Sequence, residues 1–209
     1  MAIMPERGAI MRGVMNIDRA YFRATNHFEF PELEPIRQPV NVEKWLSFQE
    51  RGKAAVYGDT GVHFYADDYT FECLWNTPGK YVEQLQRYKL IVQPDFSLYY
   101  NFPVALQVYN KYRNHWLARY LAYYGCKIVP NVNPSRPDLW SWTLDGFPRR
   151  SVVAFSDIGS FRDTEDRQTL QAGFQEMIHR LKPIQVLYFC RSVENAPAGV
   201  TPIVVSFGG

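Results

Sequence analysis

The sequence predicts one α/β domain built on a mostly parallel β-sheet. Short apolar runs that suit buried strands alternate with stretches of helix length, and parallel strands require such long crossover connections. The chain of 209 residues is 46% hydrophobic and 21% charged, which is ordinary for a folded domain. About five βα units are visible. That number suits an open doubly wound sheet, with a truncated or partly open barrel as the second choice.

The chain is expected to divide into an irregular N-terminal arm, residues 1–41, and a single α/β domain, residues 42–209. Three prolines, Pro31, Pro35 and Pro39, recur through the arm. Proline fixes its own backbone and restricts the residue before it, so this spacing disfavours a helix and predicts an extended segment.

The expected elements of the domain follow from hydrophobic periodicity and turn residues. A short helix is predicted over 42–51. Strands are predicted near 62–66, 89–92, 126–129, 151–155, 184–189 and 203–205, and the clearest helices over 103–124 and 166–181. In the first of these helices the rings recur at steps of three and four, which places Gln107, Lys111 and Asn114 on the opposite, polar side.

Composition excludes several classes of protein. The net charge of +2 falls short of the strongly basic balance of a dedicated nucleic-acid domain. Cys73, Cys126 and Cys190 are widely spaced, so neither a disulfide framework nor a zinc ribbon is expected, and the thiols are predicted to be free. There is no run of about 18 apolar residues and no signal-peptide pattern, so we expect no membrane association and a cytoplasmic location.

A polar cleft is expected at the carboxyl ends of the strands, where parallel α/β folds bind their ligands. Each predicted strand is followed by polar side chains that would meet at this edge. They are Asp67, Asp68, Asp95, Ser97, Asn131, Asn133, Ser156, Asp157, Tyr188, Cys190 and Arg191.

Asp68, Asp95 and Asp157 form the candidate metal site at this edge. Carboxylates on different strands can converge on Mg²⁺ or Mn²⁺, which prefer oxygen ligands. The chemistry would then be metal-assisted attack on a phosphate or glycosidic centre, with Asp68 and Asp95 as catalytic residues. The alternative is that each aspartate caps a helix or stabilises a turn.

Other candidates concern the ligand. Arg113 lies next to the buried stripe of its helix, with Asn110 one turn earlier, and could reach a buried anion or a carboxylate. As the predicted catalytic cation it would neutralise a phosphate. His63 is expected inside a strand, away from its carboxyl end, and therefore in the core. The predicted ligand-binding residues are Ser97, Asn131, Ser156, Gly159 and Tyr188. No GxxxxGK[ST] or GxGxxG loop supports a standard nucleotide site.

Several separated motifs resemble one known family. They are Phe64-Tyr-Ala-Asp-Asp-Tyr with Phe71, Pro94–Tyr99, Pro103, Gln107, Asn110, Tyr112-Arg113, Gly125, Ile128–Asn131, Asp145-Gly146, Val153–Ser156, Gly159 and Leu181–Pro183. In these the chain resembles domain-of-unknown-function family 4417, found mainly in phages and other mobile elements. The resemblance implies a mobile-element setting and no particular reaction.

The resemblance also ranks the candidate residues. It strengthens Asp68, Asp95, Ser97, Arg113, Asn131 and Ser156, because the matching motifs lie mostly at the predicted edge. The chain departs from the family pattern at Val132-Asn133-Pro134 and at Asp157, where a small hydroxyl residue is expected. The second departure weakens Asp157 as a metal ligand common to the family.

Three functions remain open from the sequence. The first is binding of a nucleotide or nucleic-acid phosphate at the strand ends, with Mg²⁺-dependent hydrolysis or transfer. The second is a non-catalytic phage factor that binds a host protein through Phe30–Pro39 and exposed aromatic residues near Trp140 and Trp142. The third is a sugar-processing enzyme in which Asp68 and Asp95 act as paired carboxylates.

Overall fold

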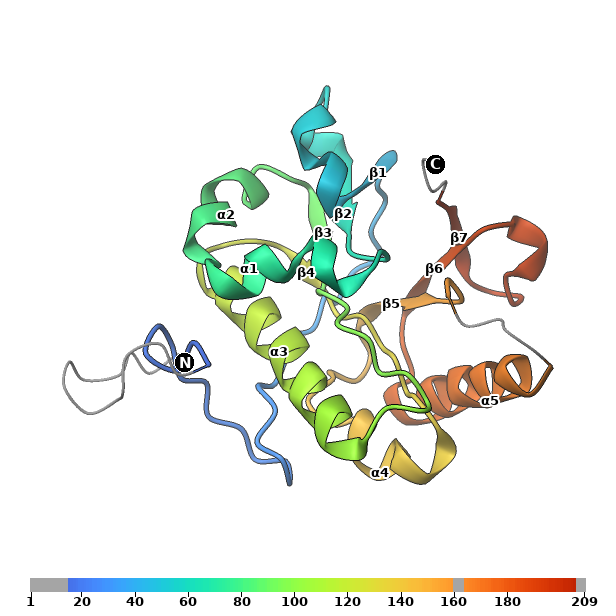
Figure 1. Cartoon of the computed structure of the whole chain (residues 1–209). Coiled ribbons are helices and arrows are strands. Elements are labelled where there is room, and N and C mark those ends of the chain that lie inside the picture. Colours follow the sequence, from blue (N-terminus) through green and yellow to red (C-terminus); the bar gives the residue numbers. More distant parts are fainter. Residues whose placement is uncertain (1–14, 160–163, 206–209) are drawn as a thin grey trace.

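The computed structural model describes residues 15–159 and 164–205 (Figure 1). Within these residues the strands pair in parallel, in the orders β1-β2-β3-β4 and β5-β6-β7. The strands are β1 (Lys44–Ser47), β2 (Thr60–His63), β3 (Leu90–Val92), β4 (Ile128–Val129), β5 (Val152–Ser156), β6 (Gln185–Cys190) and β7 (Thr201–Val204). The α-helices are α1 (Glu72–Asn76), α2 (Gly79–Leu85), α3 (Val104–Tyr123), α4 (Trp140–Thr143) and α5 (Thr164–Leu181). The predicted α/β class with parallel strands is therefore confirmed.

The two sheets meet at a parallel bridge between Asn131 and Ala154. The backbone nitrogen of Val132 donates to the carbonyl of Ala154 (2.9 Å), and that of Ala154 donates to the carbonyl of Pro130 (2.8 Å). The strands thus follow one another in chain order, without the reversal that defines a doubly wound sheet. This order matches the second expected arrangement, an incomplete barrel, and the described strands do not close it. The count of five βα units is not confirmed.

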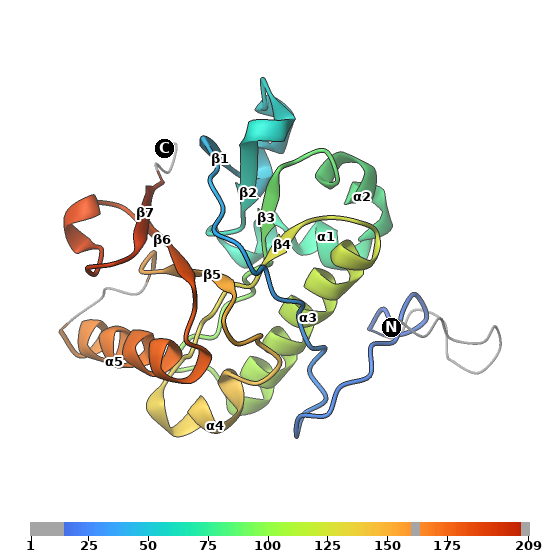
Figure 2. The same cartoon turned by 180° about the vertical axis from the view of Figure 1, so that it is seen from behind.

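Side chains alternate between the two faces of this curved sheet. Leu90 and Val92 of β3 share an inner cluster with Phe189 of β6, while the intervening Ile91 packs outward against α1, α2 and α3. On the other sheet the outward residues of β5 and β6 pack against α5. Figures 1 and 2 show α3 and α5 as the two long helices outside the strands.

The helix predicted over 42–51 is wrong. Residues 44–47 form β1, and Phe48–Lys53 form a 3-10 turn. Pairing with β2 overrides the local preference, because it buries Leu46 and turns the Trp45 ring edge-on to Phe189, with 5.0 Å between ring centroids. Gly61 makes room for this ring, since a Cβ there would lie 2.4 Å from Trp45 Cζ3.

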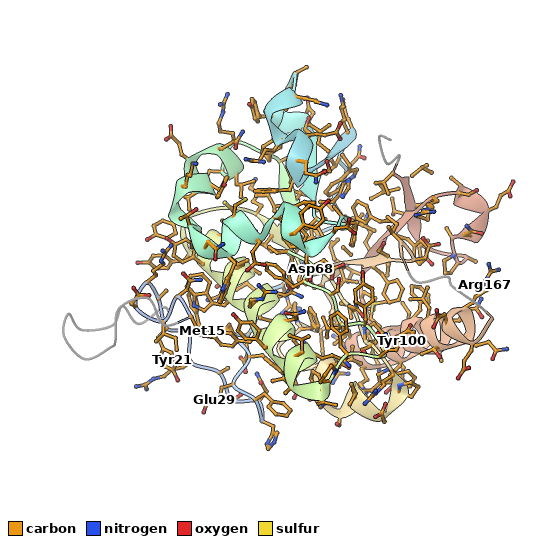
Figure 3. The ribbon with its side chains drawn as sticks, in the orientation of Figure 1. Met15, Tyr21, Glu29, Asp68, Tyr100 and Arg167 are labelled. Carbon is orange, nitrogen blue, oxygen red and sulfur yellow. The ribbon has the colours of Figure 1, made fainter. Side chains whose placement is uncertain are left out.

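Described residues 15–43 contain no helix or strand, and Figure 3 labels Met15, Tyr21 and Glu29 along them. This segment packs closely on the domain. Phe30 is fully buried with its ring 6.0 Å from that of Trp142, and Trp142 itself is only 7% exposed. The expectation that Trp142 is exposed is therefore wrong, whereas Trp140 is half-buried and Phe28, whose ring centroid lies 5.6 Å from that of Trp142, is 37% exposed. The division of the chain at residue 41 stays a prediction.

The polar side of α3 is also not where the sequence placed it. Gln107, Lys111 and Asn114 are all buried, with Lys111 only 3% exposed. This occurs because α3 is enclosed on several sides: its rings pack on the sheet, and its polar side chains meet the loops that follow the strands. The polar side of α3 therefore packs against the loops that follow the strands and is not exposed to solvent.

Two further expectations can be compared with the structure. The cysteines are free thiols, and Cys126 and Cys190 are buried, as predicted. None of the helices in the described parts of the chain has the length and apolar character needed to cross a membrane.

Candidate functional site

A pocket of about 660 Å³ opens at the carboxyl ends of the strands. The loops after β2, β3, β4, β5 and β6 all contribute to it, and the labels Asp68, Tyr100 and Arg167 in Figure 3 mark the loops after β2 and β3 and the start of α5. Its volume falls within the range of small-molecule sites. The pocket lies where the sequence placed the polar cleft, and five of the predicted site residues line it: Asp95, Ser97, Asn131, Ser156 and Gly159. Their roles stay predictions.

Asp95 is the most unusual group in this pocket. Its Oδ1 atom is buried and has no hydrogen-bond partner among the described residues. The pKa of Asp95 is raised to about 7, mainly by burial and also by the nearby charge of Asp68, while a hydrogen bond from the Asn131 side chain acts in the opposite direction. A carboxyl group that titrates near neutral pH beside a cavity is suited to acid–base chemistry or to binding a cation.

Asn131 is held in place by Tyr65. The Tyr65 hydroxyl donates to Asn131 Oδ1 (2.8 Å), and the backbone nitrogen of Asn131 donates to the side chain of Gln93 (2.9 Å). With its oxygen occupied, the Asn131 amide group presents its NH₂ to Asp95. Tyr65 is buried, and burial raises its pKa well above the ordinary value, so it remains a hydrogen-bond donor.

Asp68 does not line the pocket but supports its wall. Its carboxylate accepts hydrogen bonds from the Ser97 backbone nitrogen (3.1 Å) and from Ser97 Oγ (2.8 Å). Burial raises the pKa of Asp68, and the bonds from Ser97 lower it. These contacts tie the loop after β2 to the loop after β3.

Arg113 does not reach the pocket. Its Nη1 atom contacts both carboxylate oxygens of Glu72, at 2.8 and 2.9 Å, and its Nη2 atom donates to Asn110 Oδ1 (2.9 Å). The guanidinium also lies 3.5 Å from the ring centroid of Phe96. Arg113 is thus engaged with its own chain, and the geometry assigns it to the support of the loop after β3.

Amide side chains on α3 hold the backbone of this loop. Asn114 accepts from the Phe96 nitrogen (2.7 Å) and donates to the Phe96 carbonyl (3.0 Å). One turn earlier Asn110 donates to the Ser97 carbonyl (2.7 Å), and Gln107 accepts from Ser135 Oγ (2.7 Å). The helix therefore fixes two of the loops that form the pocket.

Asp157 and Tyr188 lie away from Asp95. Tyr188 packs in the cluster between β5, β6 and α5 and shares a hydrogen bond with Asp157. The net pKa of Asp157 is raised to about 6, because the effect of burial exceeds the opposing effects of the bond from Tyr188 and the charges of Arg191 and Arg167. Neither residue lines the pocket. The described part of the chain contains no group of three or more His, Cys, Asp and Glu side chains that could hold a metal ion, so the three predicted aspartates do not converge.

The loop after β5 forms a compact turn. Ser156 Oγ accepts from the Ile158 nitrogen (3.0 Å) and donates to the Phe189 carbonyl (3.2 Å). Gly159 has a φ of +79°, which glycine adopts without strain. Both residues line the pocket, but the Ser156 hydroxyl is already used within the turn.

His63 is placed differently from the prediction, since it is the last residue of β2. Its ring is nevertheless buried and accepts a bond from the Tyr65 nitrogen (3.3 Å). Burial lowers the pKa of His63 to about 4, so the ring is neutral at ordinary pH.

Sequence reasoning missed several residues of the pocket. Tyr65, Tyr69, Tyr99 and Tyr100 all line it. Tyr65, Tyr69 and Tyr99 lie within two of the motifs that carry the family resemblance, and Tyr100 directly follows the second of them. The signal that could have identified them is their position directly after strands, in the same loops as Asp67 and Asp95.

Comparison with known proteins gives a family and two relatives. The family model "Domain of unknown function (DUF4417)" matches residues 22–207. The chain is 33% identical over 179 residues to the Gene 1 protein of Mycobacterium phage D29, which covers 85% of this chain and 66% of that protein. It is 32% identical over 177 residues to the Gene 1 protein of Mycobacterium phage L5, covering 84% of this chain and 76% of that one. No solved structure matches.

The matched family region extends from the N-terminal segment through β7 and contains every loop of the pocket. About a third of the D29 relative lies outside its alignment with this chain. The quoted motifs, the family match and the phage relatives agree with one another. The chain belongs to the DUF4417 family, a family of phage proteins without an assigned function.

Proposed function

We propose that the protein binds a nucleotide, or one nucleotide of a nucleic acid, in this pocket, with Mg²⁺ or Mn²⁺ held at Asp95. The observation that carries the proposal is the buried Asp95 Oδ1 without a partner beside a polar cavity. Buried polar atoms almost always have a partner, so an ion or ligand is the natural one here. Mg²⁺ is commonly held by one or two carboxylates, waters and substrate phosphates, and does not need a cage of three.

The charges of the pocket support the need for a cation. Among the described residues that line it, Asp67, Asp95 and Asp166 are acidic and Arg191 is basic. A phosphate alone would meet net negative charge, whereas a divalent ion at Asp95 would bridge the carboxylate to the phosphate. Asp68 adds negative charge close by, although its oxygens are already bonded to Ser97.

The remaining lining suits the organic part of a nucleotide. Tyrosine rings stack on bases without strong sequence preference, and Tyr99 and Tyr100 lie in the wall. The side chains of Asn101 and Asn133 offer both donors and acceptors. A metal ion at Asp95 would polarise a phosphoryl oxygen and activate a bound water, so the reaction class is metal-assisted hydrolysis or transfer.

Thermal unfolding tests this proposal directly. The protein is heated with Mg²⁺ or Mn²⁺ and a set of nucleotides, with and without EDTA. A ligand at 100 times its Kd adds about 2.7 kcal/mol of stability. For a chain of this length we expect this to raise Tm by roughly 5–10 °C. EDTA should remove most of the effect.

Two variants make the test specific. Asp95→Asn should lose the metal- and nucleotide-dependent rise in Tm. Asp59→Asn, which changes a half-exposed aspartate at the amino end of β2, should keep it. The proposal is wrong if no nucleotide raises Tm in the presence of either metal, or if Asp95→Asn responds as the wild type does.

A sugar-processing enzyme is the second candidate. It is favoured by the combination of tyrosine rings with Asp67, Asp95 and Asp166 around one cavity, since sugars bind to aromatic faces and glycoside hydrolysis uses two carboxyl groups. The same thermal assay with mono- and oligosaccharides in EDTA distinguishes the two candidates. A rise in Tm that needs no metal and occurs only with sugars would support the sugar-processing enzyme and exclude the proposed nucleotide-binding function.

A further inference from the structure

Two tyrosines that line the pocket are exposed to solvent. Tyr69 is 78% exposed and Tyr99 is 41% exposed, and both line the pocket. They come from different strand ends: Tyr69 lies in the 3-10 turn Asp68–Thr70 after β2, and Tyr99 follows β3. Exposed aromatic rings beside a polar cavity are available to stack on a base or a sugar of a bound ligand.

The exposed rings stand on loops that are held firmly. Thr70 Oγ1 donates to the Asp67 carbonyl (2.7 Å), which closes the turn around Tyr69. The bonds between Asp68 and Ser97 join this turn to the loop of Tyr99. The Tyr99 ring packs edge-on against Phe102, with 5.0 Å between centroids. A stacking surface on fixed loops costs little conformational entropy when a ligand binds.

One arginine lies on the same opening. Arg191 lines the pocket, and outside the lining Arg136 donates from Nη1 to the Tyr100 carbonyl (2.9 Å) and pairs with Asp138 (3.0 Å). Arg191 also lies close enough to Asp157 to lower its pKa, as does Arg167 of α5. The lining of the pocket thus combines the exposed Tyr69 and Tyr99 rings with the Arg191 side chain.

We infer that the ligand of this pocket is a single-stranded nucleic acid, from which one nucleotide enters the cavity while a neighbouring base stacks on Tyr69. This inference rests on the proposed function and specifies its substrate class. A cavity of about 660 Å³ accommodates a ligand of nucleotide size, so the rest of a strand must pass over the opening. Exposed rings beside arginines are the chemistry that binds unpaired bases and their phosphates.

Fluorescence anisotropy with a labelled 12-nucleotide single strand tests the inference, in Mg²⁺ and with DNA and RNA of mixed sequence. The strand should bind more tightly than a mononucleotide, and the matching duplex should bind more weakly than the strand. Stacking on one aromatic residue contributes enough that Tyr69→Ala should weaken strand binding about 5- to 100-fold. Because Tyr69 lies at the opening of the pocket, the same variant should weaken mononucleotide binding, measured by thermal shift, by a much smaller factor than it weakens strand binding.

Tyr123→Ala provides the matched control. Tyr123 is 53% exposed at the last turn of α3 and does not line the pocket, so its removal should leave strand binding as in the wild type. If mononucleotides bind but strands bind no more tightly, or if Tyr69→Ala binds strands normally, the inference fails and the proposed function stands. If neither mononucleotide nor strand binds, both fail.

Discussion

The two polar regions of this molecule differ in how their hydrogen bonds are satisfied. On α3, Gln107, Asn110 and Asn114 are buried, and each amide uses both its oxygen and its nitrogen within the chain. In the pocket, Asp95 presents a buried oxygen with no partner among the described residues. Because unsatisfied buried groups cost free energy, a fold keeps few of them. Arg113 Nε, Trp140 Nε1 and Asp157 Oδ2 are also buried without a partner among the described residues, but of these residues Asp95 is the one that lines the pocket. The α3 amides therefore stabilise the structure, and Asp95 is the group placed to meet a ligand.

Asn114→Ala should give the largest loss of stability, because it removes a buried amide whose hydrogen bonds are satisfied within the chain. The Phe96 nitrogen and carbonyl would both lose their partner inside the protein. Each unsatisfied buried group costs about 1–3 kcal/mol, so we expect unfolding to become easier by about 3 kcal/mol or more. Urea unfolding followed by fluorescence measures this change.

The control for this prediction is Gln171→Ala, an exposed polar-to-alanine change on α5, which should alter stability by less than about 0.5 kcal/mol. Equal stability of Asn114→Ala and the control would mean that α3 does not hold the loop after β3 in the way its hydrogen bonds indicate.

Asp95→Asn, in contrast to Asn114→Ala, should increase the free energy of unfolding at neutral and higher pH. Folded Asp95 keeps its proton up to a pKa of about 7, whereas in the unfolded chain it loses the proton near the ordinary value of 3.8. Between these values the folded state binds more protons, so stability falls as pH rises. Asparagine cannot ionise. We expect the variant to equal the wild type near pH 4 and to exceed it at pH 8, by at most about 4 kcal/mol.

Urea unfolding in EDTA at pH 4, 6 and 8 measures this difference, with Asp59→Asn as the control that should not reproduce the gain at pH 8. The raised pKa values of Asp68 and Asp157 give the wild type the same direction of pH dependence, and it should persist in part in the variant. A variant that is less stable than the wild type at pH 8 would show that Asp95 supports the fold and would remove the contrast between the two regions.

The sequence predicted the features of the fold that depend on local order. Apolar runs between turn residues located most of the strands, and periodicity located α3 and α5, because these signals depend on local order. The position of the pocket at the carboxyl ends of the strands could be predicted from the parallel topology alone. The helix expected over 42–51 failed because pairing of Trp45 and Leu46 with β2 is a long-range contact.

The roles of individual polar residues could not be predicted in this way. In sequence, Asn114 cannot be distinguished from a residue on a solvated helix face, and the partner of Arg113 cannot be named. Only the three-dimensional structure shows that Arg113 contacts Glu72 and that Asn114 contacts Phe96. Asp157 follows a strand as Asp95 does, yet Tyr188 turns it toward α5. Which polar groups the chain itself satisfies is decided by contacts distant in sequence.

Tyr65→Phe should change stability the least of these variants. It tests the comparison between the two polar regions directly, because Tyr65 lines the pocket and its hydroxyl is hydrogen-bonded within the chain. The change removes the donor to Asn131 Oδ1, and loss of one such bond costs about 1 kcal/mol. We expect slightly lower stability in urea and a normal rise in Tm with metal and nucleotide. Asp95→Asn is expected to behave in the reverse way, with stability retained and the rise lost. If Tyr65→Phe also loses the rise in Tm with metal and nucleotide, the Tyr65 hydroxyl binds the ligand. Residues of the pocket whose hydrogen bonds are satisfied within the chain would then contribute to binding as well.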